Sequence, residues 1–312
     1  MNRFVNSIIQ FALFSVFLVI FLQIIISLRI KGKTIRGHDN LEQTSNINAD
    51  LVFIGSSRCW THFDPHFFDT TYKVKSVNIG VDGHSEISMA IIRLQDYLAR
   101  NKTPKYVVYN FDPFVYAGSF IDNDNFVHKN DFARYAFFPK KIDLPVVDYF
   151  KFDCYEKYVP LFAIFKYKLL LNSIFLNNID TWDMYGYEKH FEIWDTISKP
   201  ITDSMKKYYF KQSEIPFITN SLNRLKNLCY LNNIKLLCVQ TPVYKIIQDS
   251  AAFSETKRIC NTLSLPFVDA NKEFIRNEIK YFYNSNHLNQ FGVAELNKVL
   301  KSDSIFSFFL NK

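Results

Sequence analysis

The chain has 312 residues, of which 48% are hydrophobic and 17% are aromatic, so it can bury a sizeable core and is not typical of a disordered protein. Its formal net charge is +7, but the basic residues are scattered and form no run that alternates with aromatic residues, which argues against nucleic-acid binding. The five cysteines lack any C-x-x-C spacing, and we expect neither a disulfide framework, nor a metal site, nor a cofactor.

The first predicted element is a transmembrane anchor over residues 1–30. Residues 5–28 contain no charged side chain. At about 1.5 Å per residue, such a helix is long enough to cross the roughly 30 Å hydrocarbon layer of a bilayer. It is too long for the apolar core of a typical signal peptide, and no cleavage motif of small residues follows before Arg29. The anchor is therefore expected to stay on the protein; the alternative is a buried helix of a soluble fold.

The charges around this anchor leave its orientation open. Arg3 precedes the anchor, whereas Arg29, Lys31, Lys33 and Arg36 follow it. The positive-inside rule would then leave the main domain in the cytoplasm, although large domains can cross the membrane against local charge. The functional interpretation favours an exported domain, either periplasmic or otherwise outside the cytoplasm.

After a polar juxtamembrane linker over residues 31–49, strands alternate with helices. Short apolar runs predict strands at residues 50–55, 72–80, 105–113, 234–244 and 265–270. Helices are expected from Ser57 and over residues 85–101, 218–231 and 293–300. Alternating strands and helices imply a mostly parallel sheet with helices on both faces. Residues 50–312 are thus predicted to form a three-layer α/β/α domain of the flavodoxin-like kind.

This alternation breaks between about residues 115 and 216. The segment is rich in aromatic residues, and the part over residues 149–175 has the composition of a helix. We predict that it is an aromatic-rich helical insertion between the third and fourth strands. Insertions at strand ends often form lids or walls of a substrate site.

Polar residues gather where the predicted strands end, which is where ligands bind in open α/β sheets. The first strand runs directly into Gly55, Ser56, Ser57 and Arg58. Backbone N–H groups point outward at the first turn of a helix, so a serine there could form a tetrahedral oxyanion beside its own donors. Such a nucleophile needs a base, and His287, in a polar loop before the last helix, is the candidate. The alternatives are an ordinary helix cap and an ordinary loop histidine.

Three short motifs, in chain order, resemble a known family. They are "FIGSSR", "NIGVDG" and "NSNHLNQFG". Together they resemble the SGNH (GDSL-like) hydrolase superfamily, and more closely its membrane-anchored members associated with acyl transfer onto exported polymers. The resemblance covers about residues 50–300 without the insertion, and only the serine and histidine motifs are specific.

The resemblance implies a role for several residues. Ser57 takes the position of the nucleophile, and Ser56 replaces the aspartate of the Gly-Asp-Ser motif. The backbone N–H of Gly80 would be one donor of the oxyanion hole. The side chain of Asn110 would be another, although the Gly-x-Asn-Asp pattern that usually carries it is absent.

The last motif departs most from the family pattern. Asp-x-x-His becomes Asn284-Ser285-Asn286-His287, so Asn284 stands where the family has a carboxylate. In serine proteases, the loss of that carboxylate to asparagine lowers turnover about 10⁴-fold. An asparagine carbonyl can still accept the Nδ1 proton of His287 but brings no full charge, and Asp269 could substitute for it. A Ser–His dyad and a weakened or inactive site both stay open.

Two functions follow from these residues and the resemblance. The first is a membrane-anchored, serine-dependent acyl-ester hydrolase or O-acyltransferase that acts on a cell-envelope polysaccharide or a related polymer. Its expected partners are the lipid bilayer, an integral-membrane acyltransferase and the acylated glycan. The alternative is a weak or inactive scaffold or glycan-binding subunit of a cell-envelope complex. In either case Arg58 could bind an anionic substrate group or pair with a surface carboxylate.

Overall fold

The computed structural model describes residues 2–30, 44, 46–81, 87–114, 185–201 and 209–310. The chain forms two compact units, Met1–Arg36 with Asp124–Asp180, and Gly37–Asn123 with Thr181–Lys312. The predicted helix over residues 149–175 lies outside the described residues. Of the predicted insertion, residues 185–201 and 209–216 are described. The first stretch contains turns and loops without a helix or strand, and the second contains a 3₁₀ turn (Gln212–Glu214) and the start of a helix at Ile215.

The described part of the first unit is one long helix, α1 (Asn2–Ile30). Its 29 residues give a length of about 44 Å. The window Arg3–Leu22 has a mean hydropathy of 2.3, and none of it is buried in the protein. By length and composition this helix can cross a membrane.

The second unit is built on a five-stranded parallel sheet with strand order β2-β1-β3-β4-β5. The strands are β1 (Leu51–Ile54), β2 (Ser76–Asn78), β3 (Tyr106–Asn110), β4 (Lys235–Gln240) and β5 (Phe267–Asp269). Each is predominantly buried, as expected of a sheet covered on both faces. The strand order is the flavodoxin-like one, so the predicted fold class is confirmed.

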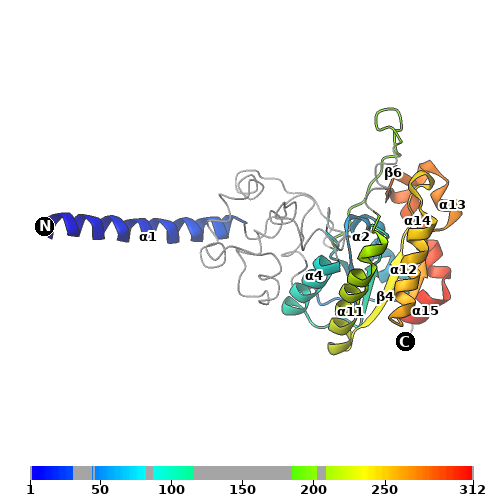
Figure 1. Ribbon diagram of the computed structural model, residues 1–312, viewed down its shortest axis with the longest axis horizontal. Helices are drawn as coiled ribbons and strands as arrows, with labels where there is room; N and C mark the ends of the chain where they lie inside the picture. The colour runs from blue at the N-terminus through cyan, green and yellow to red at the C-terminus, as the bar shows by residue number, and fades with distance from the viewer. Residues whose placement is uncertain are drawn as a thin grey trace. The chain divides into compact units, whose positions relative to one another are not determined.

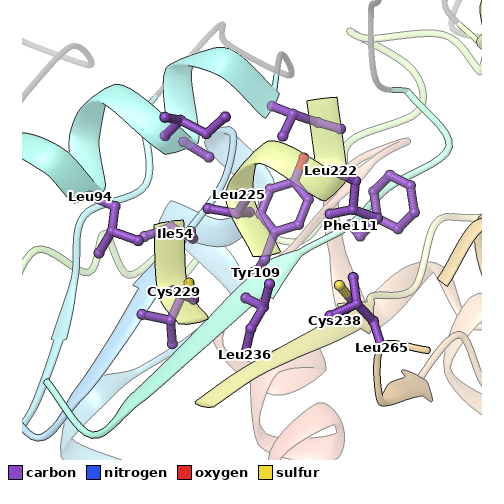
Figure 2. Close-up of a cluster of buried hydrophobic side chains, with 14 of the residues drawn as sticks. Ile54, Leu94, Tyr109, Phe111, Leu222, Leu225, Cys229, Leu236, Cys238 and Leu265 are labelled. Atoms are coloured by element: carbon purple, nitrogen blue, oxygen red, sulfur yellow. The ribbon is translucent and has the colours of Figure 1, made fainter. Parts of the chain in front are cut away.

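Helices cover both faces of this sheet (Figure 1). They are α2 (Ser57–His62), α3 (Pro65–Tyr72), α4 (Ile87–Arg100), α11 (Ile215–Leu231), α12 (Ser250–Thr262), α13 (Glu273–Arg276), α14 (Gln290–Ser302) and α15 (Ser304–Leu310). Alternate strand residues point to opposite layers. In β1, Val52 and Ile54 pack with residues of α4, α11 and α12, whereas Leu51 and Phe53 pack with residues of α3, α14 and α15. Figure 2 shows part of the first of these two cores.

The second predicted strand, over residues 72–80, is shorter than expected because a helix precedes it. The sequence analysis missed α3, which begins after the cap Asp64 and has proline at its start. This helix ends at Lys73, which adopts the left-handed conformation with φ of 56°. β2 therefore starts only at Ser76. The same analysis also missed α12 and the hairpin of β6 (Phe282–Asn284) and β7 (His287–Leu288), which carries the candidate base.

Candidate active site

The turn from β1 into α2 presents Ser57 at the start of the helix. Gly55 has φ of +149°, and a Cβ there would lie 2.9 Å from the Cβ of Cys59 and 3.0 Å from the Cβ of Asn110. The turn therefore needs glycine. Ser56 caps the helix, because its Oγ accepts a hydrogen bond from the N–H of Arg58 at 3.3 Å. Ser57 follows as the first helical residue and is half-buried.

The β6–β7 hairpin brings the histidine to this serine from the far end of the chain. His287 Nε2 lies 2.8 Å from Ser57 Oγ, although 230 positions separate the two residues. On the other side of the ring, His287 Nδ1 lies 3.0 Å from Asn284 Oδ1. The turn of the hairpin is held in place where the carbonyl of Ser285 accepts from the N–H of Tyr244 at 3.0 Å. Ser57, His287 and Asn284 thus form one continuous chain of hydrogen bonds.

The direction of each hydrogen bond in this chain follows from Asn284. Its Oδ1 also accepts from the backbone N–H groups of Asn286 at 3.1 Å and His287 at 3.0 Å, so the atom facing the histidine must be the carbonyl oxygen. His287 Nδ1 then carries the proton and donates it to Asn284. Nε2 of the neutral ring is left as an acceptor for the hydroxyl of Ser57. This is the tautomer that a general base requires.

The surroundings of His287 keep its imidazole neutral. Burial, the positive charge of Arg58 and the neighbouring His190 lower the pKa of His287 to about 3. Asp269, the suggested substitute for the missing carboxylate, bonds elsewhere: its Oδ1 accepts from Gln240 Nε2 at 3.2 Å and from the N–H of Asn271 at 3.0 Å. The Nδ1 partner of His287 is therefore a neutral amide.

Arg58 is enclosed by the protein rather than open to a ligand. Its side chain is buried, and Nε lies 2.9 Å from Oδ2 of Asp112, a carboxylate that is also buried. Its Nη2 donates to the carbonyl of Thr241 at 2.7 Å, and its Nη1 donates to the carbonyl of Asn286 at 2.6 Å. Burial raises the pKa of Asp112, and the charge of Arg58 opposes that rise. An anionic substrate group would have to displace these contacts to reach Arg58.

The two predicted oxyanion donors are also occupied within the protein. The N–H of Gly80 donates to Oδ1 of Asn78 at 2.9 Å. A Cβ at Gly80 would lie 2.7 Å from the backbone nitrogen of Trp60, so close packing of the segment after β2 against α2 already requires glycine here. Asn110 Nδ2 donates to the carbonyl of Val239 at 3.2 Å and to Oγ1 of Thr241 at 3.3 Å, which uses both of its N–H groups. Either group would have to exchange its partner to bind an oxyanion.

The sequence analysis missed His62, the last residue of α2. It is fully buried, and its Nε2 accepts the N–H of Leu288 at 2.9 Å while Nδ1 lies 2.8 Å from Oγ1 of Thr241. Burial, with the charge of Arg58, lowers the pKa of His62 well below its ordinary value. The spacing of Arg58 and His62, four residues apart in a short helix, was the signal that could have marked both as facing one site.

Two further aromatic rings lie beside the base. Tyr283 stacks on His287 with ring centroids 5.4 Å apart, and His190 stacks on Tyr283 at 3.7 Å. His190 comes from the loop over residues 185–201. No pattern in the sequence indicated that this loop contacts the hairpin. The ring of Tyr283 therefore lies next to His287 and connects it to His190.

Comparisons with known proteins add a fold-level likeness. No family model matches, and no curated protein matches. The chain is similar in structure to a presumed acylhydrolase from Bacteroides fragilis NCTC 9343, with 13% identity, a TM-score of 0.39, and coverage of 83% of this chain and 87% of that chain. It is also similar to a GDSL-like lipase from Bacteroides thetaiotaomicron VPI-5482, with 13% identity, a TM-score of 0.38, and coverage of 83% and 88%. Likeness this low says nothing about chemistry, which rests on the geometry of the site.

Proposed function

We propose that the protein is a serine-dependent acyl-ester hydrolase or O-acyltransferase of the SGNH-like kind. One observation carries the proposal: Ser57, His287 and Asn284 form a hydrogen-bonded chain with distances of 2.8 Å and 3.0 Å. Both distances lie within the range expected between a nucleophile, its base and the group that orients the base. The tautomer fixed by Asn284 leaves Nε2 free to take the proton of Ser57.

The first half-reaction would form an acyl-enzyme. Ser57 Oγ attacks the carbonyl carbon of an acyl ester while its proton passes to His287 Nε2. The backbone N–H of Ser57, which has no acceptor inside the helix, is placed to stabilise the negative oxygen that forms. The tetrahedral intermediate then breaks its ester bond, and His287 returns the proton to the departing alcohol.

The second half-reaction would decide between hydrolase and transferase. Water or a sugar hydroxyl gives its proton to His287 Nε2 and attacks the acyl-enzyme. The ester to Ser57 breaks, Oγ recovers the proton from His287, and the products are a free acid or a new ester. The chemistry at the enzyme is the same for both acceptors, so access to Ser57 decides the outcome.

The substrate and location in this proposal draw on the motifs and on α1. A helix able to span a bilayer would hold the site at the membrane surface, where an acylated cell-envelope polysaccharide and an integral-membrane acyltransferase could both reach it. An exported second unit suits such a substrate, although Arg29 and Lys31 after the anchor favour the opposite orientation. These steps rest on resemblance, because a fold does not specify a substrate.

A second candidate function has its own supporting observation. Gly80 and Asn110 donate to protein acceptors, and a neutral amide replaces the orienting carboxylate. An inactive scaffold or a glycan-binding subunit could keep such a site without turnover. The two candidates differ in whether Ser57 reacts with an electrophile.

The decisive experiment uses the full chain in detergent micelles and a fluorophosphonate probe, which reacts with activated serines. We expect the unaltered protein to be labelled and the Ser57→Ala variant to lose its label. Ser254→Ala is the matched control, because Ser254 lies exposed on α12 and its hydroxyl donates within that helix, to the carbonyl of Ser250. If the unaltered protein and Ser57→Ala show the same low labelling, the enzyme proposal fails and the scaffold is favoured.

A second assay separates the two acceptors. The full chain is incubated with an O-acetylated polysaccharide, once alone and once with an unacetylated sugar oligomer. Release of acetate without labelling of the oligomer indicates a hydrolase. Acetate appearing on the oligomer indicates a transferase. If the protein reacts with the fluorophosphonate but yields neither free acetate nor an acetylated oligomer, O-acetylated polysaccharides are not its class of substrate.

A further inference from the structure

We infer that His62 is a positioning residue that, together with Arg58, sets the place of the base His287 relative to Ser57. The inference rests on the proposed function and goes beyond it by assigning a role to a buried histidine outside the Ser57–His287–Asn284 chain. It starts from the backbone on either side of the base.

Both neighbours of His287 are held by the helix that carries the nucleophile. The carbonyl of Asn286, just before the base, accepts from Arg58 Nη1 at 2.6 Å. The N–H of Leu288, just after the base, donates to His62 Nε2 at 2.9 Å. Ser57, Arg58 and His62 all belong to α2, which has only six residues. The helix α2 therefore carries the nucleophile and forms hydrogen bonds to the hairpin on both sides of the base.

The protonation state of His62 follows from these contacts. Because the Leu288 N–H donates to Nε2, that nitrogen is an acceptor, and the proton of the neutral ring must lie on Nδ1. Nδ1–H then donates to Thr241 Oγ1 at 2.8 Å, and the same oxygen accepts from Arg58 Nη2 at 2.8 Å. Arg58 and His62 thus both form hydrogen bonds to Thr241, which follows β4. These bonds connect α2 and the hairpin to the sheet.

The two backbone contacts help to orient His287, which the neutral amide of Asn284 does only in part. A carboxylate orients a catalytic histidine by charge and by hydrogen bonding, whereas Asn284 offers hydrogen bonding alone. Hydrogen bonds to the peptide groups on both sides of His287 fix the position of its backbone. The imidazole ring then needs less orientation from Asn284, the partner of its Nδ1. His62 also lies edge-on to the ring of His287, with ring centroids 6.1 Å apart, and we expect its effect to pass through the position of His287.

Two substitutions at this position separate positioning from packing. His62→Leu removes the acceptor for the Leu288 N–H, whereas His62→Gln keeps an acceptor oxygen near the place of Nε2. Thr256→Val is the control for losing a buried hydrogen bond, because Thr256 is fully buried on α12 and its hydroxyl bonds to Gln240 and to the carbonyl of Phe253, away from His287.

The experiment measures fluorophosphonate labelling of the full chain in detergent, with the maximal rate and the half-saturating probe concentration determined separately. We expect His62→Leu to lower the maximal rate about 10- to 100-fold, the size of effect seen when a histidine that binds a metal loses the group that orients it. The half-saturating concentration should stay unchanged. His62→Gln should recover most of the rate, and Thr256→Val should label like the unaltered protein.

Each other outcome has a definite meaning. Equal rates for His62→Leu and the unaltered protein would overturn the positioning role while leaving the enzyme proposal intact. An equal loss in His62→Leu, His62→Gln and Thr256→Val would reduce the effect to general destabilisation and overturn it as well. Failure of the unaltered protein to label at all would instead remove the proposed function, and the positioning role with it.

Discussion

Two buried regions of the second unit are held together in different ways. Between the sheet and helices α4 and α11, an apolar cluster that includes Leu222 fills the space with hydrocarbon and aromatic rings (Figure 2). Around the ends of β3 and β4, Arg58, Asp112, His62 and Thr241 form a cluster of polar groups. Burial hardly differs, since Leu222 is 0% exposed and Arg58 is 2% exposed.

The difference lies in what each contact requires. Apolar contacts have no direction, so the first cluster depends on total volume and tolerates a substitution that keeps it. Hydrogen bonds and ion pairs need a particular atom in a particular place, so each buried polar group depends on its own partner. We therefore expect the apolar cluster to determine stability, and the polar cluster to determine stability and the geometry of the site together.

The largest effect is expected at His287, the proposed base, because its substitution tests most directly whether the polar cluster controls the reactivity of Ser57. His287→Leu should slow fluorophosphonate labelling of Ser57 about 10²- to 10⁴-fold, because a positioned base contributes a factor of that size. Its control is His66→Leu, at an exposed histidine on α3, which should label normally. Equal labelling of His287→Leu and the unaltered chain would mean that Ser57 is not activated by this histidine.

The next largest effect is expected for the buried ion pair. Arg58→Met leaves the carboxylate of Asp112 buried without its cation and should lower the free energy of unfolding by about 3–5 kcal/mol. Adding Asp112→Leu should restore much of that loss, because both buried charges are then gone. Labelling should stay slow even in the double variant, since the carbonyl of Asn286 has lost its donor. Thermal unfolding and labelling, measured on the same samples, would show whether stability and labelling separate in this way.

A somewhat smaller effect on stability alone is expected in the apolar cluster. Leu222→Ala should lower the free energy of unfolding by about 2–5 kcal/mol, because it removes buried methyl groups and leaves a cavity. Labelling of Ser57, measured well below the melting temperature, should be unchanged. If Leu222→Ala slowed labelling as much as Arg58→Met does, the distinction between the two regions would be wrong.

The sequence was sufficient for the sheet because the strands are simple. Runs such as Leu51–Ile54 are apolar throughout, and this pattern directly indicates a strand buried on both faces. The helix α3 escapes prediction because it is only eight residues long and begins with Asp64 and Pro65, residue types that also start turns. Short elements whose start signals also occur in turns are hard to separate by pattern alone.

The site was predictable in part for a related reason. Ser57 and His287 could be paired in advance because motifs at both ends of the chain pointed to them. The contacts that hold the peptide around His287 could not, because Arg58 and His62 bond there to backbone groups of Asn286 and Leu288 that any sequence would supply. A contact with a backbone atom does not depend on which residue supplies that atom, so the sequence does not indicate it.

The smallest effect is expected from changing the partner of the base without changing its shape. Asn284→Asp keeps an acceptor oxygen 3.0 Å from His287 Nδ1 and adds a negative charge. A carboxylate favours the imidazolium, so the pKa of His287 should rise from about 3. Labelling of the unaltered chain should stay nearly constant from pH 8 to about pH 5, because the base is already unprotonated there. The variant should label faster at pH 8 and begin to lose rate at a higher pH.

The gain in rate at pH 8 should be well below the about 10⁴-fold loss that the opposite change causes in serine proteases. There the asparagine gives the histidine the wrong tautomer, whereas here the N–H groups of Asn286 and His287 hold the carbonyl oxygen toward the ring. Asn261→Asp, the same change at an exposed position of α12, controls for net charge. A rate that fell with a midpoint near pH 6.5 in the unaltered chain would show that burial and Arg58 do not depress the pKa of the base, and that the polar cluster acts on Ser57 through geometry alone.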